Sequence, residues 1–193
     1  MLIPTVTEMI EALNRLGHKV FINGDYNLNL IGIRKDYQAS NRFDDTMAAF
    51  YKIGGRWQIQ HWPVTTDPGW YYLENGLSKG TAILKEGQYR GAYRLGLHKG
   101  QYKALVQAKP VTVYRDANKD HRLDTARAET GLFGINIHRA GQWAASTLVD
   151  KWSAGCQVFA DPDDFMALLS LARRSADLYG PALTYTLIKE ADL

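Results

Sequence analysis

Apolar and polar residues alternate along much of the chain, and this pattern predicts a protein built mainly of antiparallel strands. Residues 47–63 alternate on both sides of Gly54 and Gly55, which is typical of a hairpin. Residues 19–34 alternate around another glycine turn, and we expect a hairpin or one long strand there, with its polar side chains facing solvent. The remaining strands are expected at 80–84, 89–95, 102–107, 111–114, 134–137 and 183–188.

Helical spacing of apolar residues predicts a helix near each end of the chain. Residues 5–16 begin with Thr5, a preferred N-cap, and Glu8 follows three positions later as in a capping box. Residues 161–179 begin with Asp161, and acidic residues in the first turn favour a helix start. We therefore expect an α+β fold, mainly antiparallel β, with an N-terminal helix and a second helix after the cysteine of the chain.

The composition is that of a globular protein, because 46% of the 193 residues are hydrophobic and 22% are charged. No repeat or linker divides the chain, so we expect a single domain over 1–193, and a monomer. The formal net charge is only +3, and no element gathers Lys and Arg, which argues against a nucleic-acid partner. No stretch approaches the about 20 apolar residues that cross a membrane.

Cys156 is the only cysteine, so it is a small buried residue, one metal ligand among several, or a nucleophile. Its surroundings favour the nucleophile. His138 lies eighteen positions upstream, and Ser153 and Gly155 provide a turn whose backbone N–H groups can face a site. The imidazole can activate the thiol by accepting its proton or by stabilising the thiolate as imidazolium, and we expect the thiol to ionise below its ordinary pKa of about 8.5.

These residues resemble the signature of the L,D-transpeptidase catalytic domain, also called YkuD-like: a histidine, a gap, then Ser or Thr, His, Gly and Cys. The chain supplies four of them in that order: His138, Ser153, Gly155 and Cys156. Ala154 stands where the family has its second histidine, and the residues after the cysteine, from Gln157, also differ. The resemblance covers about residues 47–160 and leaves outside it an N-terminal helix and strand in 1–46 and a C-terminal helix and strand in 161–193.

The resemblance implies a β-sandwich or barrel-like domain and a peptidoglycan substrate. Cys156 would attack the carbonyl of the third residue of a stem peptide, at its bond to D-alanine, and form an acyl-enzyme. His138 would be the base, the backbone carbonyl of Arg139 would orient its ring, and N–H groups of Gly155 and Cys156 would hold the oxyanion. Stem peptides or muropeptides are thus the expected partners, and this chemistry requires no cofactor.

Two other classes of cysteine enzyme are disfavoured, one by the order of histidine and cysteine and one, which shares that order, by the position of the arginines. Papain-like enzymes place the cysteine before the histidine, whereas this chain places it after. A sortase needs an arginine soon after its cysteine, but the next arginines are Arg173 and Arg174, within the second predicted helix.

The N-terminus lacks a basic start followed by an apolar stretch, so we expect no secretory signal and a cytoplasmic protein. It would act on wall fragments inside the cell, or reach the bacterial cell wall by phage lysis, like a phage endolysin, or by a dedicated secretion route. Limited access to the polymer favours an L,D-carboxypeptidase or endopeptidase over a cross-linking L,D-transpeptidase. The alternative is a non-catalytic wall-binding protein of a phage or secretion system that retains the fold.

A second set of residues matches part of a calcium-binding loop. Four side chains take positions 1, 3, 5 and 9 of an EF-hand-like loop: Asp116, Asn118, Asp120 and Asp124. His121 and Arg127 depart from the loop pattern, so a structural calcium site and a plain polar turn both stay open. Zinc is disfavoured, because one cysteine and scattered histidines lack paired ligand spacing. His98, in a glycine-framed turn, and Gln157 are further candidates for contact with substrate.

Overall fold

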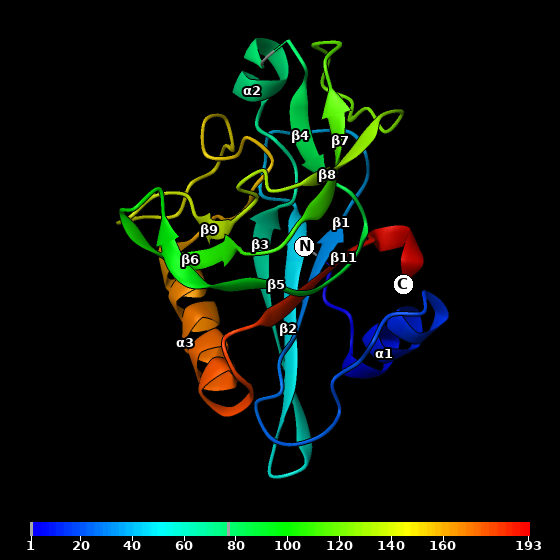
Figure 1. Ribbon diagram of the computed structural model, residues 1–193, viewed down its shortest axis with the longest axis vertical. Helices are drawn as coiled ribbons and strands as arrows, with labels where there is room; N and C mark the ends of the chain where they lie inside the picture. Colours follow the sequence, from blue (N-terminus) through cyan, green and yellow to red (C-terminus); the bar gives the residue numbers. More distant parts are fainter. Residues whose placement is uncertain (1, 77) are drawn as a thin grey trace.

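The computed structural model describes residues 2–76 and 78–193 as an α+β protein (Figure 1). Its elements in chain order are α1 (Val6–Arg15), β1 (Asn29–Arg34), β2 (Asp45–Ile53), β3 (Arg56–Thr65), α2 (Trp70–Asn75), β4 (Thr81–Leu84), β5 (Gly87–His98), β6 (Tyr102–Gln107), β7 (Val111–Asp116), β8 (Ala128–Gly131), β9 (Ile137–Arg139), β10 (Gln157–Phe159), α3 (Pro162–Tyr179), β11 (Leu183–Lys189) and the short turn η1 (Glu190–Asp192).

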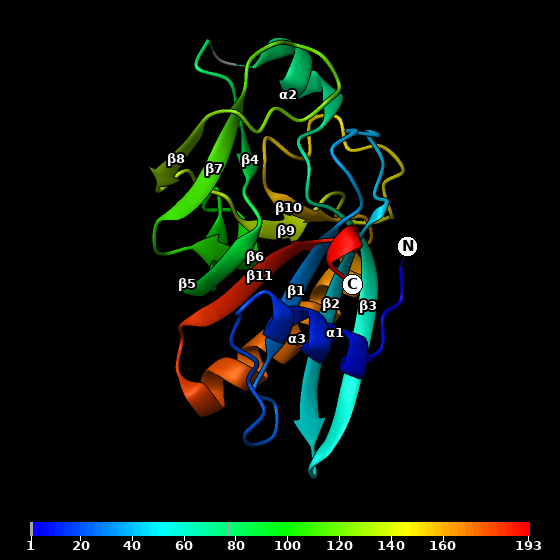
Figure 2. The ribbon, with the colours of Figure 1, turned by 90° about the vertical axis from the view of Figure 1, so that its right-hand side faces the viewer.

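Eight of the strands close into a mixed barrel, in the order β1-β11-β5-β6-β9-β10-β3-β2. The other three, β4, β7 and β8, form a small sheet at one end of the barrel, next to α2 (Figure 2). Most strand pairs are antiparallel, as expected, but β1 with β11 and β9 with β10 are parallel. β9 contains His138, and β10 begins directly after Cys156.

Both terminal segments contribute strands to the barrel. β1 pairs antiparallel with β2 and parallel with β11, so Leu30 lies opposite Ala49 on one side and Tyr185 on the other. β11 then pairs with β5 and joins the end of the chain to its middle. β1 and β11, which lie outside the family resemblance, therefore belong to the same closed sheet as the strands within it.

The helices α1 and α3 lie on opposite sides of the barrel in Figure 1, and in Figure 2 α1 lies in front of α3. α1 starts with the expected capping box, in which the Thr5 hydroxyl accepts the N–H of Glu8 and the Glu8 carboxylate accepts the N–H of Thr5. Met9 and Leu13 of α1 are buried against apolar residues of β1 and β2, including Phe50. No helix within 2–76 and 78–193 is long and apolar enough to cross a bilayer.

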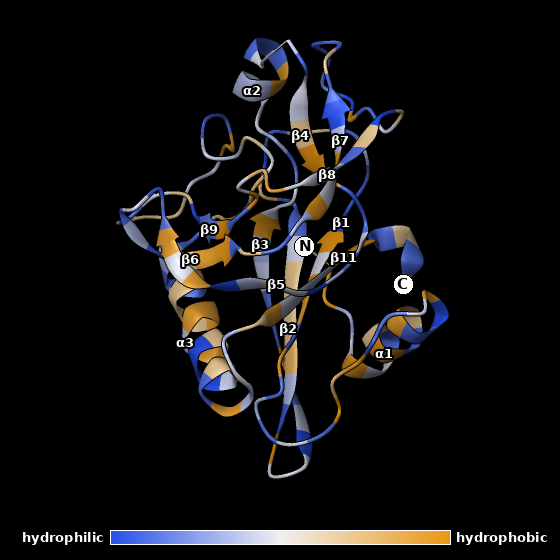
Figure 3. Ribbon diagram, viewed as in Figure 1, coloured by the Kyte–Doolittle hydropathy of each residue, from blue (hydrophilic) through white to orange (hydrophobic). Residues whose placement is uncertain are grey.

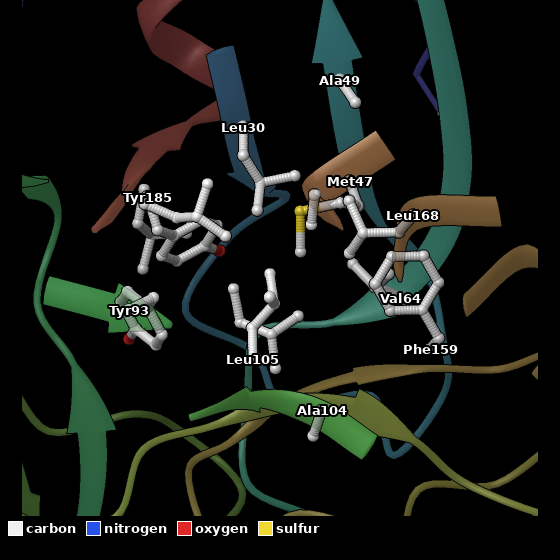
Figure 4. Packing of buried hydrophobic residues seen from close by; sticks show 14 of the residues in the cluster. Leu30, Met47, Ala49, Val64, Tyr93, Ala104, Leu105, Phe159, Leu168 and Tyr185 are labelled. Carbon is white, nitrogen blue, oxygen red and sulfur yellow. The ribbon is translucent and has the colours of Figure 1, made fainter. Parts of the chain in front are cut away.

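The barrel interior and α3 share one hydrophobic core (Figure 4). Leu30, Met47 and Leu105 enter it from three strands, and Leu168 of α3 packs near Phe159 of β10. Figure 3 shows apolar bands alternating with polar ones along α3, as a helix with one buried face requires. Each fully buried side chain of this size contributes roughly 1.5–3 kcal/mol, so α3 anchors the chain directly after the cysteine.

The hairpin or long strand expected over 19–34 is wrong in its first half, since only β1 (Asn29–Arg34) forms there. Residues 19–28 are irregular, because the side chain of Asn29 takes the place of a partner strand. Its Oδ1 accepts the N–H of Phe21 at 2.8 Å, and its Nδ2 donates to the carbonyl of Phe21 at 2.9 Å. Asn29 is consequently only 3% exposed and Arg34 is fully buried, so neither faces solvent as expected.

Arg34 ties the barrel to the small sheet. Its guanidinium pairs with Asp67, beyond β3, at 3.0 Å and with Glu86, between β4 and β5, at 2.6 Å. It also donates to the carbonyl oxygens of Leu84 at 3.0 Å and Thr66 at 2.9 Å. Because the arginine is enclosed, every one of its partners is needed to offset the cost of burying the charge.

Candidate active site

Two short parallel strands bring Cys156 and His138 together. His138 is the central residue of β9, and Cys156 immediately precedes β10, where Val158 lies opposite His138. The N–H of Gln157 donates to the carbonyl of Asn136 at 2.9 Å, which places Cys156 alongside Asn136. Since neighbouring strands lie about 4.8 Å apart, Cys156 lies one strand spacing from Asn136, which is two positions along the chain from His138.

The thiol is held by the backbone segment that leads into β9. Sγ accepts the N–H of Asn136 at 3.4 Å and donates to the carbonyl of Gly134 at 3.5 Å, and among the described residues no hydrogen bond joins it to His138. Part of Cys156 reaches the surface. Burial nevertheless raises the pKa of the thiol to about 11, outweighing the Asn136 N–H and the charge of Lys99. The expected lowering of this pKa is therefore wrong.

His138 is 3% exposed, and its neighbours fix its ring. Nδ1 lies 2.8 Å from the carbonyl oxygen of Arg139 and 3.2 Å from the hydroxyl of Tyr102, which itself donates to that carbonyl at 3.2 Å. A carbonyl can only accept a hydrogen bond, so Nδ1 carries the proton and Nε2 keeps its lone pair. The structure thus contains the contact between His138 and the Arg139 carbonyl that the resemblance implies.

The electrostatics of the pair favour one of the two routes of activation. Burial, with a smaller contribution from the neighbouring His98, lowers the pKa of His138 to about 3. With the thiol pKa near 11 and the imidazole pKa near 3, both groups are neutral at physiological pH. The geometry therefore suits a neutral imidazole that accepts the thiol proton during attack, rather than a preformed thiolate–imidazolium pair.

Gly155 and Ser153 shape the turn before the thiol. Gly155 has a φ of +112°, and a Cβ there would lie 2.1 Å from the carbonyl oxygen of Ala82 in β4, so only glycine fits. The buried Ser153 hydroxyl accepts the N–H of Gly155 at 3.1 Å and donates to the carbonyl of Cys156 at 2.8 Å. The Gly155 N–H is thus already engaged, and of the two expected oxyanion donors only the Cys156 N–H has no acceptor within the described chain.

Gln157 does not offer its side chain to a ligand, contrary to expectation. It is fully buried, its Oε1 accepts the hydroxyl of Tyr185 at 2.8 Å, and its Nε2 donates to the carbonyl of Gly155 at 3.3 Å. Both polar ends therefore bond to the protein, and Gln157 supports the thiol turn from inside the barrel.

His98 enters the site from the β5–β6 hairpin, together with residues that the sequence analysis did not single out. The rings of His98 and His138 stack with their centroids 4.0 Å apart. Tyr102, directly opposite His98 in the hairpin, reaches His138 with its hydroxyl, and Asn136 contacts both the thiol and His98. Strand alternation places Asn136 and His138 on one face of the same segment, which was the local signal available for Asn136.

A hollow of about 560 Å³ borders the thiol segment. It is lined by Ala154, next to Gly155, and by Phe133, next to the Gly134 carbonyl that accepts from the thiol. Its charged lining side chains are Lys79 and Arg115, and Arg115 is ion-paired with Glu129. The hollow therefore offers apolar contact and positive charge beside the candidate nucleophile.

The Asp-rich segment forms a polar turn between β7 and β8. Asn118 donates its amide to Asp120 at 3.1 Å and to Asp124 at 3.2 Å, and the N–H of Asp124 donates to Asp116 at 3.0 Å. The oxygens expected to hold calcium are thus largely bonded within the segment, although one oxygen of the buried Asp116 has no partner. In the described part of the chain, no three His, Cys, Asp or Glu side chains are arranged to hold a metal ion.

Comparisons of the chain with protein-family models, with curated proteins and with solved structures find no match. The geometry around Cys156 and His138, together with the sequence resemblance, is therefore what supports a functional proposal.

Proposed function

We propose that the protein is a cysteine hydrolase or acyltransferase in which Cys156 is the nucleophile and His138 the general base. The observation that carries this proposal is the fixed tautomer of His138. The Arg139 carbonyl accepts the hydrogen bond of Nδ1–H, so Nε2 keeps its lone pair. His138 lies on the strand next to the segment that carries Cys156, the one cysteine of the chain. The obligatory glycine at 155 supports it further, because it sets the turn that presents the thiol.

In the proposed reaction, Sγ attacks the carbonyl carbon of an amide while Nε2 of His138 takes the thiol proton. The π electrons of the carbonyl move to its oxygen, and the N–H of Cys156 donates to the resulting oxyanion. Collapse of the tetrahedral intermediate breaks the C–N bond, and the amine leaves with the proton from Nε2. Water or an amine then attacks the thioester while Nε2 takes a proton from the attacking group, the C–S bond breaks, and that proton passes to Sγ to restore the thiol.

In the substrate-free protein the thiol and the imidazole are both neutral, and this sets a requirement for the reaction. Because burial disfavours the thiolate, proton transfer has to accompany the approach of the carbonyl. The thiol also has to exchange its bond to Gly134 for one to His138 when substrate binds.

The proposed substrate is a peptidoglycan stem peptide, cleaved between its third residue and D-alanine. The order and spacing of His138, Ser153, Gly155 and Cys156 support this proposal through their resemblance to the L,D-transpeptidase domain. The ammonium group of Lys79, which lines the hollow beside the thiol segment, also suits the carboxylates of a stem peptide. Of the two acyl acceptors we propose water, which makes the protein an L,D-carboxypeptidase or endopeptidase.

The second candidate is a non-catalytic wall-binding protein that retains the site. Two observations favour it: the thiol pKa near 11, and a thiol that bonds to Gly134 where a ready catalytic pair would bond to His138.

Digestion of defined muropeptides separates the two candidates. We expect the wild-type protein to release D-alanine from a tetrapeptide muropeptide, and Cys156→Ala to abolish release with the fold intact. His138→Ala should lose nearly as much activity, and the double variant little more, because a base and its nucleophile act as one unit. Muropeptide binding without product would favour the binder, whereas residual cleavage by Cys156→Ala would place the nucleophile elsewhere.

A further inference from the structure

A second histidine packs directly on the proposed base. The ring of His98, at the end of β5, stacks on that of His138 with a 4.0 Å centroid separation and a 28° interplanar angle. His98 is 6% exposed, so it is an interior residue of the site and not part of its rim. The ring of Tyr102 lies next to it, 5.5 Å away between centroids.

A chain of amide hydrogen bonds fixes the tautomer of His98. The N–H of Gln107 donates to Oδ1 of Asn136 at 2.9 Å, so the amide group of Asn136 has to present its Nδ2 to His98. That Nδ2 lies 3.1 Å from Nδ1 of His98. Nδ1 of His98 is therefore the acceptor, and the ring proton sits on Nε2.

Gln107 is itself held on all sides. Its Oε1 accepts the N–H groups of Phe133 and Ile135 at 3.0 Å, and its Nε2 donates to Gly131 at 2.8 Å and Lys109 at 2.9 Å. The two acceptor bonds flank Gly134, whose carbonyl accepts from the thiol. The same side chain thus orders the segment that positions Sγ.

Asn136 links the two halves of the site. Its backbone N–H donates to Sγ at 3.4 Å, while its side chain holds His98 against His138. We infer that His98 and Asn136 are positioning residues of the proposed reaction: Asn136 orients the thiol and His98 together, and His98 packs the ring of His138 in the orientation of a general base. This inference rests on the proposed function, because it assigns roles within that site.

The packing also predicts how the base titrates. Titratable and charged groups lie around His138 on every neighbouring element. They are His98 of β5, Lys99 of the following turn, Tyr102 of β6, Arg139 of β9 and Cys156 just before β10. Burial is the largest cause of the low pKa of His138, and His98 is one of the groups that bury it. Removing the His98 ring admits water, so the pKa of His138 should rise towards the ordinary value of about 6.5.

The test compares His98→Ala and His98→Phe with wild type, with His61→Ala as the matched control. His61 is a partly buried histidine that, like His98, makes one hydrogen bond, but its partner is the carbonyl of Pro4. For His98→Ala we expect kcat to fall about 10- to 100-fold with little change in KM, because the base is misplaced. The acid limb of the pH–rate profile should move up by more than about one pH unit as the base protonates earlier.

His98→Phe keeps a ring stacked on His138, so the acid limb should return to its wild-type position. Because phenylalanine offers Asn136 no acceptor, only part of kcat should be restored. His61→Ala should leave both unchanged. An acid limb in His98→Ala that coincides with that of wild type would overturn the inference, because loss of folded protein alone lowers activity without moving the limb.

A second measurement keeps the inference separate from the function. NMR titration of the His138 ring needs no substrate and should show a neutral ring protonated at Nδ1 in wild type and a raised pKa in His98→Ala. If wild type cleaves no muropeptide but this titration holds, the proposed function fails and the positioning stands. If muropeptides are cleaved but the titration of His138 is the same in both proteins, the positioning fails alone. If His98→Ala does not fold, the titrations of His138 in His98→Phe and in wild type test the inference instead. A wild-type His138 with a pKa of about 6.5 would contradict the packing.

Discussion

At the scale of single residues, Gly155 is the position where the site is least tolerant of change. Its φ of +112° disfavours any side chain, and a Cβ would lie 2.1 Å from a backbone oxygen that cannot move without shifting β4. We expect Gly155→Ala to lower the free energy of unfolding by more than about 2 kcal/mol, measured by urea denaturation. Gly100 is the matched control, because it also has a positive φ, +71°, but open space where its Cβ would stand.

Gly100→Ala should therefore cost only the backbone strain, about 1 kcal/mol. Equal losses for Gly155→Ala and Gly100→Ala would show that the contact with the Ala82 carbonyl does not restrict the turn.

The thiol pKa gives a second prediction at this scale. Because burial raises the pKa of Cys156 to about 11, the thiolate fraction of the folded protein should stay small until well above the ordinary thiol value. Alkylation by iodoacetamide should accelerate up to about pH 10 or beyond in the native protein, but level off above about pH 8.5 in the unfolded one. A native plateau below about pH 8.5 would indicate a preformed thiolate–imidazolium pair instead.

The candidate site shows how far a sequence leads at this scale. Cys156, His138 and Gly155 stand in one short stretch, so their chemistry is readable from residue types and order. His98 and Gln107 come from a hairpin thirty or more positions earlier, and only the pairing of β6 with β9 brings them in. Side-chain hydrogen bonds such as those of Gln157 and Ser153 depend on which way each side chain points, and no local pattern encodes that.

At the scale of elements, the sequence pattern predicted correctly the helices and the hairpin, whose caps and turns lie within the segment itself. The two predicted helices correspond to α1 and α3, and the glycine hairpin over 47–63 corresponds to β2 and β3. β8 was missed because its residues are mostly exposed and do not alternate, and α2 because six residues carry too little periodicity. In the 19–34 segment the alternation is present, but Asn29 satisfies the backbone of Phe21 and replaces the ladder that a strand would form.

The capping box of α1 provides the prediction at this scale. Thr5→Ala removes the hydroxyl that accepts the Glu8 N–H, and we expect it to lower the free energy of unfolding by about 1 kcal/mol. Thr7, inside the same helix and exposed, is the control, because alanine is the better helix former there. Thermal unfolding of both variants should show a loss for Thr5→Ala and none for Thr7→Ala, and equal effects would argue against the cap.

At the scale of the whole molecule, the buried Arg34 network joins the barrel to the sheet that carries β4. Arg34→Met would leave the buried Asp67 and the partly buried Glu86 without their cation, and we expect it to cost about 3–5 kcal/mol in the free energy of unfolding. Lys35 is the neighbouring control, because its ion pair with Asp44 is exposed and Lys35→Met should change stability little. Similar denaturant midpoints for the two variants would contradict a role for Arg34 in joining the barrel and the sheet.

The same network links stability to the site, because the carbonyl of Ala82 in β4 closes over Gly155. The parallel closure of β1 on β11 likewise places the ends of the chain in the barrel that holds β9 and β10. Neither the approach of Ala82 to Gly155 nor the pairing of β1 with β11 has a local signature in the sequence, because each joins segments that lie far apart along the chain.

Trapping the acyl-enzyme tests the central claim most directly. Wild-type protein is mixed with a tetrapeptide muropeptide, quenched in acid within seconds and analysed by intact mass and peptide mapping, with Cys156→Ala in parallel. We predict a tripeptide acyl group on Cys156, formed with release of one D-alanine and absent from the variant. D-alanine release that persists in Cys156→Ala, or a wild-type protein that stays unmodified and releases none, would contradict the assignment of Cys156 as the nucleophile.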